Sequence, residues 1–146
     1  ARMLLEIKSP DRLEAWLDAA LASGEKIMGF GHRVYKEGDP RAKILKAMSR
    51  EITREVGHPE MYEMSARLEE LMGQRKGLIC NVDFYSASVY HSMGIPIDLF
   101  TPVFATSRVA GWCAHVLEQY QNNRIYRPRG KYVGPTGEVY TPIDER

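Results

Sequence analysis

A histidine flanked by glycines and cations is the most reactive feature of this sequence. His32 follows Gly29 and Gly31 closely, and Lys36 and Arg41 come shortly after it. Glycines let the backbone approach a ligand, histidine exchanges protons near neutral pH, and the cations can hold anions. The spacing suits a small acidic substrate that needs proton transfer. A basic loop in front of a well-capped helix explains the same residues without chemistry, and the spacing alone leaves both interpretations open.

Two further charged residues stand where chemistry or structure could use them. Asp83, in the run Asn81-Val82-Asp83, could act as a general base, but an aspartate before a helix is also a common N-cap. Arg108 lies in a mostly apolar helical segment, where a buried guanidinium requires an anionic partner. That partner could be a substrate carboxylate or a structural acidic residue.

The elements that position these residues read as helices joined by short loops. Apolar residues recur at helical spacing, and proline, N-cap and glycine signals mark the ends. No pattern of a parallel sheet appears, so the sequence predicts an all-α fold. The predicted helices begin at Ser9-Pro10-Asp11, Asp39-Pro40, Pro59, Asn81 or Asp83, and Thr101-Pro102, and end at Gly24, Gly57, Gly73, Met93 and about Asn123.

The last segment, residues 124–146, is rich in proline and glycine. It predicts an extended tail with one small hairpin around Pro135-Thr136-Gly137. Such a tail has too little apolar surface to order itself, so we expect it to lie on another part of the protein or on a second subunit.

Length and composition narrow the classes of function. A chain of 146 residues allows one ordinary domain, and a net charge of +1 gives no reason to expect binding to nucleic acid or membranes. Cys80 and Cys113 form no Cys-x-x-Cys pair, so we expect buried free thiols and a reducing, cytoplasmic location. The histidines show no metal-ligand spacing, and we expect no metal.

Four blocks in this order resemble the citrate synthase family and together span nearly the whole chain. They are residues 29–36 (GFGHRVYK) with 39–42 (DPRA), 81–86 (NVDFYS) with 94–96 (GIP), 104–112 (FATSRVAGW) with 114–115 (AH), and 127–129 (RPR) with 132–134 (YVG). No single block is specific, but the set is.

The resemblance implies an acyltransferase that condenses acetyl-CoA with oxaloacetate and hydrolyses citryl-CoA to citrate and CoA, a reaction of the tricarboxylic acid cycle. By the same resemblance Asp83 is the catalytic base, and His32 binds and protonates the carbonyl of oxaloacetate. Arg41, Arg108 and Arg127 match the arginines that bind oxaloacetate, and the family supplies Arg127 from the neighbouring subunit of a homodimer.

The resemblance also implies where CoA binds, as a co-substrate rather than a permanently held cofactor. The backbone of Met28, Gly29, Phe30 and Gly31 matches the loop that cradles the adenine. Lys36 matches a cation for the CoA phosphate, and Asn81 lies near the same groove.

One family motif is absent from this sequence. Citrate synthases carry a second catalytic histidine in a Leu-His-Gly-Gly-Ala-Asn type motif, just upstream of a segment like residues 2–6. We therefore expect this chain to be a C-terminal part that is inactive alone and lacks an N-terminal large domain. The expected division is a small domain over 1–98, the last large-domain helix over 99–123, and the tail over 124–146. A 2-methylcitrate synthase using propionyl-CoA, or a non-catalytic helical module that binds anions or mediates assembly, are the alternatives.

Overall fold

The computed structural model describes all 146 residues and is helical throughout, as predicted. It contains no strand, only an isolated antiparallel bridge between Phe30 and Cys80. The α-helices are α1 (Arg2–Ile7), α2 (Leu13–Ala22), α3 (Pro40–Glu55), α4 (Pro59–Lys76), α5 (Val82–Ser92) and α6 (Phe100–Gln121). Short 3-10 helices are η1 (Pro10–Arg12), η2 (Ile97–Leu99) and η3 (Ile143–Glu145).

The chain forms two compact units, Ala1–Arg108 and Val109–Arg146, with the boundary inside α6. This division differs from the predicted boundaries at residues 98 and 123, which remain a prediction about domains of a longer protein. Each unit is described here by itself.

Local signals explain where α3 and α5 begin. The Asp39 carboxylate accepts the backbone N–H of Arg41 at 3.0 Å, and Pro40 occupies the first turn of α3. For α5 the cap is Asn81, whose side-chain oxygen accepts the N–H of Asp83 at 3.0 Å. Asp83 is therefore not the N-cap, and its carboxylate is left for another role.

Two predicted helix boundaries and one predicted hairpin are wrong. Gly73 does not end α4, which continues to Lys76 and closes at Gly77 in the left-handed conformation, because a helix tolerates an interior glycine. The last long helix begins at Phe100 rather than at Thr101-Pro102, directly after η2. No hairpin forms around Pro135, since the segment from Asn123 to Pro142 contains only bends.

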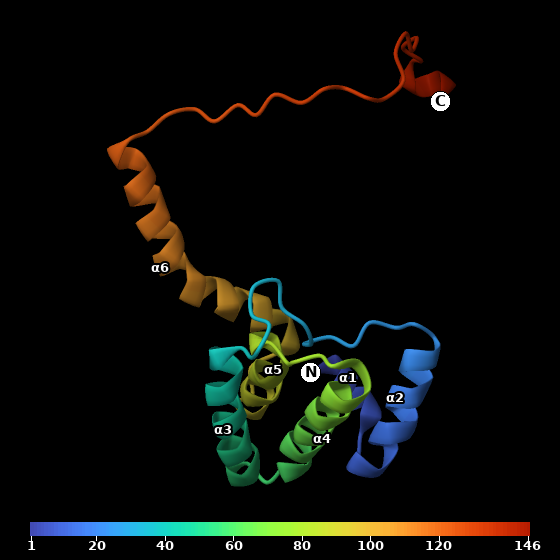
Figure 1. Cartoon of the computed structure of the whole chain (residues 1–146), viewed down its shortest axis with the longest axis vertical. Helices are drawn as coiled ribbons and strands as arrows, with labels where there is room; N and C mark the ends of the chain where they lie inside the picture. The colour runs from blue at the N-terminus through green and yellow to red at the C-terminus, as the bar shows by residue number, and fades with distance from the viewer. The chain divides into compact units, whose positions relative to one another are not determined.

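Helix α5 lies at the centre of the first unit, packed against both α3 and α4 (Figure 1). Residues 84–89 of α5 are all buried. The core around this helix is built from apolar side chains of α1, α2 and α4, including Leu4, Ile7, Leu13, Leu17, Met64 and Leu68. Burial on several sides fixes α5 firmly, so the residues at its start are held in a defined place.

The second unit consists of the end of α6, an extended segment and η3, and nearly all of its side chains are exposed. Its large apolar residues include Trp112, which is 53% exposed, and Leu117, which is 64% exposed. Cys113 is exposed as well, so the prediction of two buried thiols holds only for Cys80. No helix of the chain is both long and apolar enough to cross a membrane.

Candidate active site

The site residues of the first unit gather where α3 and α5 begin. The loop between α2 and α3 passes over this end of the helices (Figure 1), and it carries His32. Arg41 lies in the first turn of α3 and Asp83 in the first turn of α5. Asp83 is thus brought to the same end of the bundle as His32 and Arg41, which lie more than 40 residues earlier in the sequence.

The ring of His32 is held by two backbone donors. Its Nδ1 accepts the N–H groups of Val34 and Tyr35, each at 3.0 Å, and the ring packs at 4.6 Å from that of Tyr35. A nitrogen that accepts two hydrogen bonds carries no proton, so the neutral imidazole bears its proton on Nε2. His32 therefore offers Nε2–H as a hydrogen-bond donor.

This donor meets a second one. Nη2 of Arg41 lies 3.4 Å from Nε2 of His32. Two N–H groups that face each other cannot satisfy one another, and an acceptor that lies beside the pair, within hydrogen-bond distance of both nitrogens, would bind both. A carbonyl next to a carboxylate, as in a 2-keto acid, presents adjacent oxygens that suit this pair.

Asp39 binds the edge of Arg41 that is formed by Nε and Nη2, and it leaves free the edge formed by Nη1 and the second hydrogen of Nη2. Nε and Nη2 of Arg41 donate to the two carboxylate oxygens at 2.9 and 2.8 Å. These hydrogen bonds raise the pKa of Arg41, and the negative charge of Asp83 adds a smaller effect in the same direction. They also lower the pKa of Asp39, whose side chain is fully buried. The positive charge in the first turn of α3 is thus already offset by Asp39, a partner that the sequence analysis missed.

The predicted CoA loop is pinned to the segment before α5. The N–H of Gly31 donates to the carbonyl of Ile79 at 2.8 Å, and the N–H of Asn81 donates to the carbonyl of Gly29 at 2.9 Å. Gly29 has a φ of +90°, and an added Cβ would lie 2.9 Å from the side chain of Phe84. Only glycine allows this close approach between the loop and α5.

Asn81 is a structural link in this arrangement. Its Oδ1 caps α5, and its Nδ2 donates to the carbonyl of Gly31 at 3.0 Å. Both ends of the side chain are therefore used within the chain, which favours a positioning role over direct contact with CoA. Phe30 is buried, and its ring packs 4.6 Å from that of Phe84.

The remaining predicted residues lie outside this cluster of contacts. Met28 is 64% exposed, and Lys36 is exposed without an ion pair. Arg108 is exposed at the end of the first unit and forms no ion pair, so this chain by itself does not bury it, and its role toward oxaloacetate stays a prediction. Arg127 is exposed in the second unit, in the segment that follows α6.

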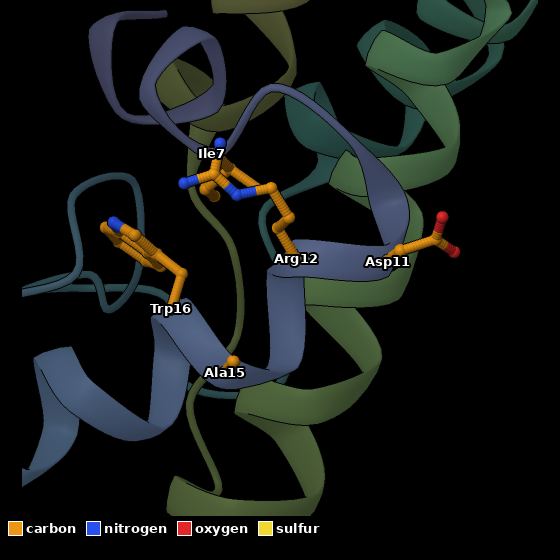
Figure 2. Close-up of a pocket in the computed structure, with 5 residues that line it drawn as sticks. All are labelled: Ile7, Asp11, Arg12, Ala15 and Trp16. Carbon is orange, nitrogen blue, oxygen red and sulfur yellow. The ribbon is translucent and has the colours of Figure 1, made fainter.

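A shallow pocket of about 380 Å³ lies elsewhere in the first unit, against α1, η1 and α2 (Figure 2). It is lined by Ile7, Asp11, Arg12, Ala15 and Trp16 and contains none of the predicted site residues. In Figure 2 the carboxylate of Asp11 points away from the side chains of Arg12 and Trp16. No group of three or more His, Cys, Asp or Glu side chains lies close enough together to hold a metal ion.

Comparison with known proteins assigns the chain to a family. The sequence model described as "Citrate synthase, C-terminal domain" matches residues 1–129. The chain belongs to the citrate synthase family. It is 57% identical to citrate synthase 2 of Bacillus subtilis over 145 residues, covering 99% of this chain and 39% of that protein. It is 51% identical over 122 residues to a 2-methylcitrate synthase of Shewanella oneidensis, covering 84% of this chain and 32% of that protein.

A solved citrate synthase has the same fold. The enzyme of the archaeon Thermoplasma acidophilum, in a ternary complex with carboxymethyl coenzyme A and oxaloacetate, superposes with a TM-score of 0.82 and 41% identity. The match covers 99% of this chain and 40% of that one. This citrate synthase family chain thus spans about two-fifths of the length of the relatives it matches.

Proposed function

We propose that this chain is the C-terminal part of a citrate synthase, which condenses acetyl-CoA with oxaloacetate to give citrate and CoA. The observation that carries the proposal is the pair of donors on His32 and Arg41, whose nitrogens lie 3.4 Å apart at the helix end that also carries Asp83. The family membership supports the reaction class, and the relative solved with oxaloacetate and a CoA analogue supports the substrates.

In this proposal His32 and Arg41 bind the keto-carboxylate end of oxaloacetate. Nε2–H of His32 donates to the keto oxygen, and the free edge of Arg41 donates to the neighbouring carboxylate. Negative charge develops on the keto oxygen as the new carbon–carbon bond forms, and the Nε2 proton is placed to neutralise it. Donors fixed before the reaction stabilise such charge effectively because they need no reorganisation.

Asp83 is assigned to the acetyl group. Its carboxylate takes a proton from the methyl carbon of acetyl-CoA, and the resulting enolate attacks the keto carbon of oxaloacetate. Water then cleaves the thioester of citryl-CoA and releases citrate and CoA. Since the amide of Asn81 already caps α5, the Asp83 carboxylate is exposed and free to reach a substrate.

A longer protein supplies the rest of this site. We propose that the upstream histidine of the family motif binds the thioester oxygen and that Arg108 and Arg127 complete the oxaloacetate site. The loop at residues 28–31 and Lys36 are proposed to contact CoA, and the enzyme is proposed to act in the cytoplasm.

The proposal is tested by assaying the complete protein for release of free CoA thiol from oxaloacetate and acetyl-CoA. The 146-residue chain is assayed in parallel and should be inactive alone. Thiol release that requires oxaloacetate supports the proposal. A complete protein that folds but releases no thiol with either acetyl-CoA or propionyl-CoA would favour the non-catalytic helical module.

A 2-methylcitrate synthase is the second candidate, supported by the 51% identity to the Shewanella oneidensis protein. Propionyl-CoA adds one methylene, which is worth about 1–3 kcal/mol of discrimination in a fitted pocket. Parallel kcat/KM values for acetyl-CoA and propionyl-CoA decide between the two, since the true substrate should be preferred by tenfold or more on that scale.

We further propose that the complete enzyme is a homodimer in which Arg127 completes the site of the partner subunit. Inactive Arg127→Leu and Asp83→Asn enzymes would be mixed under conditions that exchange subunits. In each heterodimer one site then regains both residues, and activity should return toward half that of a normal dimer. Heterodimers that stay as inactive as the separate variants would show that Arg127 serves its own subunit.

A further inference from the structure

Asp39 is the most heavily used carboxylate in the structure. It accepts the backbone N–H, Nε and Nη2 of Arg41 at 3.0, 2.9 and 2.8 Å, and the backbone N–H of Val82 at 3.0 Å. Its side chain has no exposed surface. A buried charge is tolerated only when it is well paired, and these four hydrogen bonds supply the pairing.

The backbone donors come from two different helices. The N–H of Arg41 belongs to the first turn of α3, and the N–H of Val82 is the first of α5. Unpaired N–H groups at a helix start carry partial positive charge, so one carboxylate placed between two helix starts stabilises both. The two helices are thereby joined at the end that carries the proposed site.

The side-chain bonds set the orientation of Arg41. Nε and Nη2 donate to Asp39, and the same Nη2 lies 3.4 Å from Nε2 of His32, so these bonds hold the remaining edge, Nη1 and the second hydrogen of Nη2, beside His32. Without Asp39 the guanidinium could rotate, and its free edge would no longer be aimed beside Nε2 of His32.

We propose that Asp39 is a positioning residue that holds the free edge of Arg41 and the first turn of α5, which carries Asp83, in one fixed arrangement. This inference rests on the proposed function, in which Arg41 binds oxaloacetate and Asp83 removes the proton. Asp39 touches neither substrate. It acts through Arg41, which binds oxaloacetate, and through Asp83, which removes the proton from acetyl-CoA.

The test begins with Asp39→Asn in the complete enzyme. The amide nitrogen would face donors of Arg41 or Val82, so the shape is kept while at least two of the four hydrogen bonds are lost. Misplacing catalytic groups by about 1 Å costs roughly 10²-fold, and kcat/KM for oxaloacetate should fall by about that factor. Asp39→Ser is the second variant, because serine caps α3 as well as aspartate but cannot reach Arg41 and Val82 together.

Double-mutant cycles separate positioning from general destabilisation. If Asp39 acts through Arg41, Asp39→Asn should weaken oxaloacetate binding by less than about threefold once Arg41→Leu is present. If it also acts through Asp83, its effect on kcat should likewise shrink in the Asp83→Asn background. A purely structural role predicts effects that multiply in both cycles, and that result would overturn the proposal.

Ser49→Ala is the matched control, because Ser49 is fully buried between the same two helices and its Oγ lies 2.7 Å from that of Ser88. It should lower thermal stability and leave oxaloacetate binding within twofold of wild type. Amide exchange at Arg41 and Val82 should accelerate in Asp39→Asn and not in Ser49→Ala.

The activity of the wild-type enzyme separates failure of the proposed function from failure of the proposed role of Asp39. An inactive wild-type complete enzyme overturns the proposed function and this inference with it. An active wild type with Asp39→Asn or Asp39→Ser folded and within threefold of normal in both oxaloacetate binding and kcat overturns this inference alone.

Discussion

Two carboxylates tie the same helices together, and they do so in different ways. Asp39 lies at the ends of α3 and α5 and accepts backbone N–H groups and a guanidinium. Glu69 of α4 lies along the bundle and accepts only side chains, with Lys46 Nζ at 2.6 Å, Tyr85 OH at 2.5 Å and Cys80 Sγ at 3.2 Å. Asp39 fixes functional groups, whereas Glu69 fixes the helices that support them.

The electrostatic consequences differ as well. Burial opposes ionisation of Glu69, but hydrogen bonds from Lys46 and Tyr85 outweigh it and lower the pKa of Glu69. Burial, with Glu69 beside it, raises the pKa of Cys80 to about 12, so this thiol is inert near neutral pH. At Asp39 the lowered pKa comes mainly from Arg41, a residue that the proposed mechanism uses. The comparison predicts that damage at the Asp39 end reduces activity, and damage at Glu69 reduces stability.

Asp83→Asn should have the largest effect at the Asp39 end. The amide keeps the shape of the side chain and cannot accept the proton of the acetyl methyl group. A general base contributes typically about 10²–10⁴-fold, so kcat of the complete enzyme should fall by that factor. Calorimetry should find oxaloacetate binding nearly unchanged. A kcat close to normal would show that Asp83 is not the base.

Arg41→Leu should have the next largest effect. Losing one charge-assisted contact should weaken oxaloacetate binding by about 1.5–3 kcal/mol. The same change leaves Asp39 buried without its cation, so the melting temperature should also fall. Arg108→Leu is the informative companion, because Arg108 has no partner in this chain and should weaken binding by a similar amount without that loss of stability. Unchanged binding in both variants would remove the arginines from the oxaloacetate site.

The sequence predicted the helices better than the contacts between them. Asp39-Pro40 and Pro59 are local signals, and both helix starts were correct. Gly73 and Gly77 look alike in sequence, and only the backbone conformation decides which of them ends α4. The six-residue helix α1 was missed because it carries no N-cap side chain.

The same contrast between local signals and contacts across the fold applies to the site. His32, Arg41 and Asp83 were found by resemblance, and the structure brings them to one helix end. Asp39 was recognised only as a cap for α3, because its bond to Val82 joins residues 43 positions apart. A contact at that separation depends on how α5 packs on α3, which no local pattern records.

Glu69→Gln should reduce stability rather than activity. Lys46 and Tyr85 both donate to Oε2 of Glu69, so the carbonyl oxygen of Gln can still accept from both, but without the negative charge, and its amide nitrogen would face the Cys80 thiol. Hydrogen bonds to a charged group contribute about 1.5–3 kcal/mol and neutral ones about 0.5–1.5 kcal/mol, so the loss should be about 1–3 kcal/mol, which chemical denaturation of the wild type and variant would measure. KM for oxaloacetate should stay within twofold of wild type. A tenfold rise in KM without loss of stability would show that Glu69 affects the site, and that the two carboxylates do not have separate roles in activity and stability.

The pH dependence of the stability difference between wild type and Glu69→Gln tests whether the charge of Glu69 causes it. Because the pKa of Glu69 is lowered in the folded chain, its contribution is complete above the ordinary glutamate pKa and is lost as the pH falls through the folded value. The stability gap between wild type and Glu69→Gln should therefore be constant near neutral pH and shrink in acid, below about pH 4. A gap that is unchanged down to pH 2 would assign the loss to packing instead of charge.

The smallest effect is expected for Ser49→Ala, which probes the α3–α5 contact away from both carboxylates. Ser88 Oγ already donates its proton to the carbonyl of Tyr85 at 3.0 Å, so Ser49 must be the donor in their 2.7 Å hydrogen bond. Removing Ser49 Oγ therefore leaves no proton unpaired, and the loss should be only about 0.5–1.5 kcal/mol. Ser88→Ala is the matched variant, and it should cost more because the Ser49 hydroxyl proton would then lose its acceptor. Equal losses in denaturation would contradict this assignment of the donor, and any change in kcat would mean that this contact is coupled to the site.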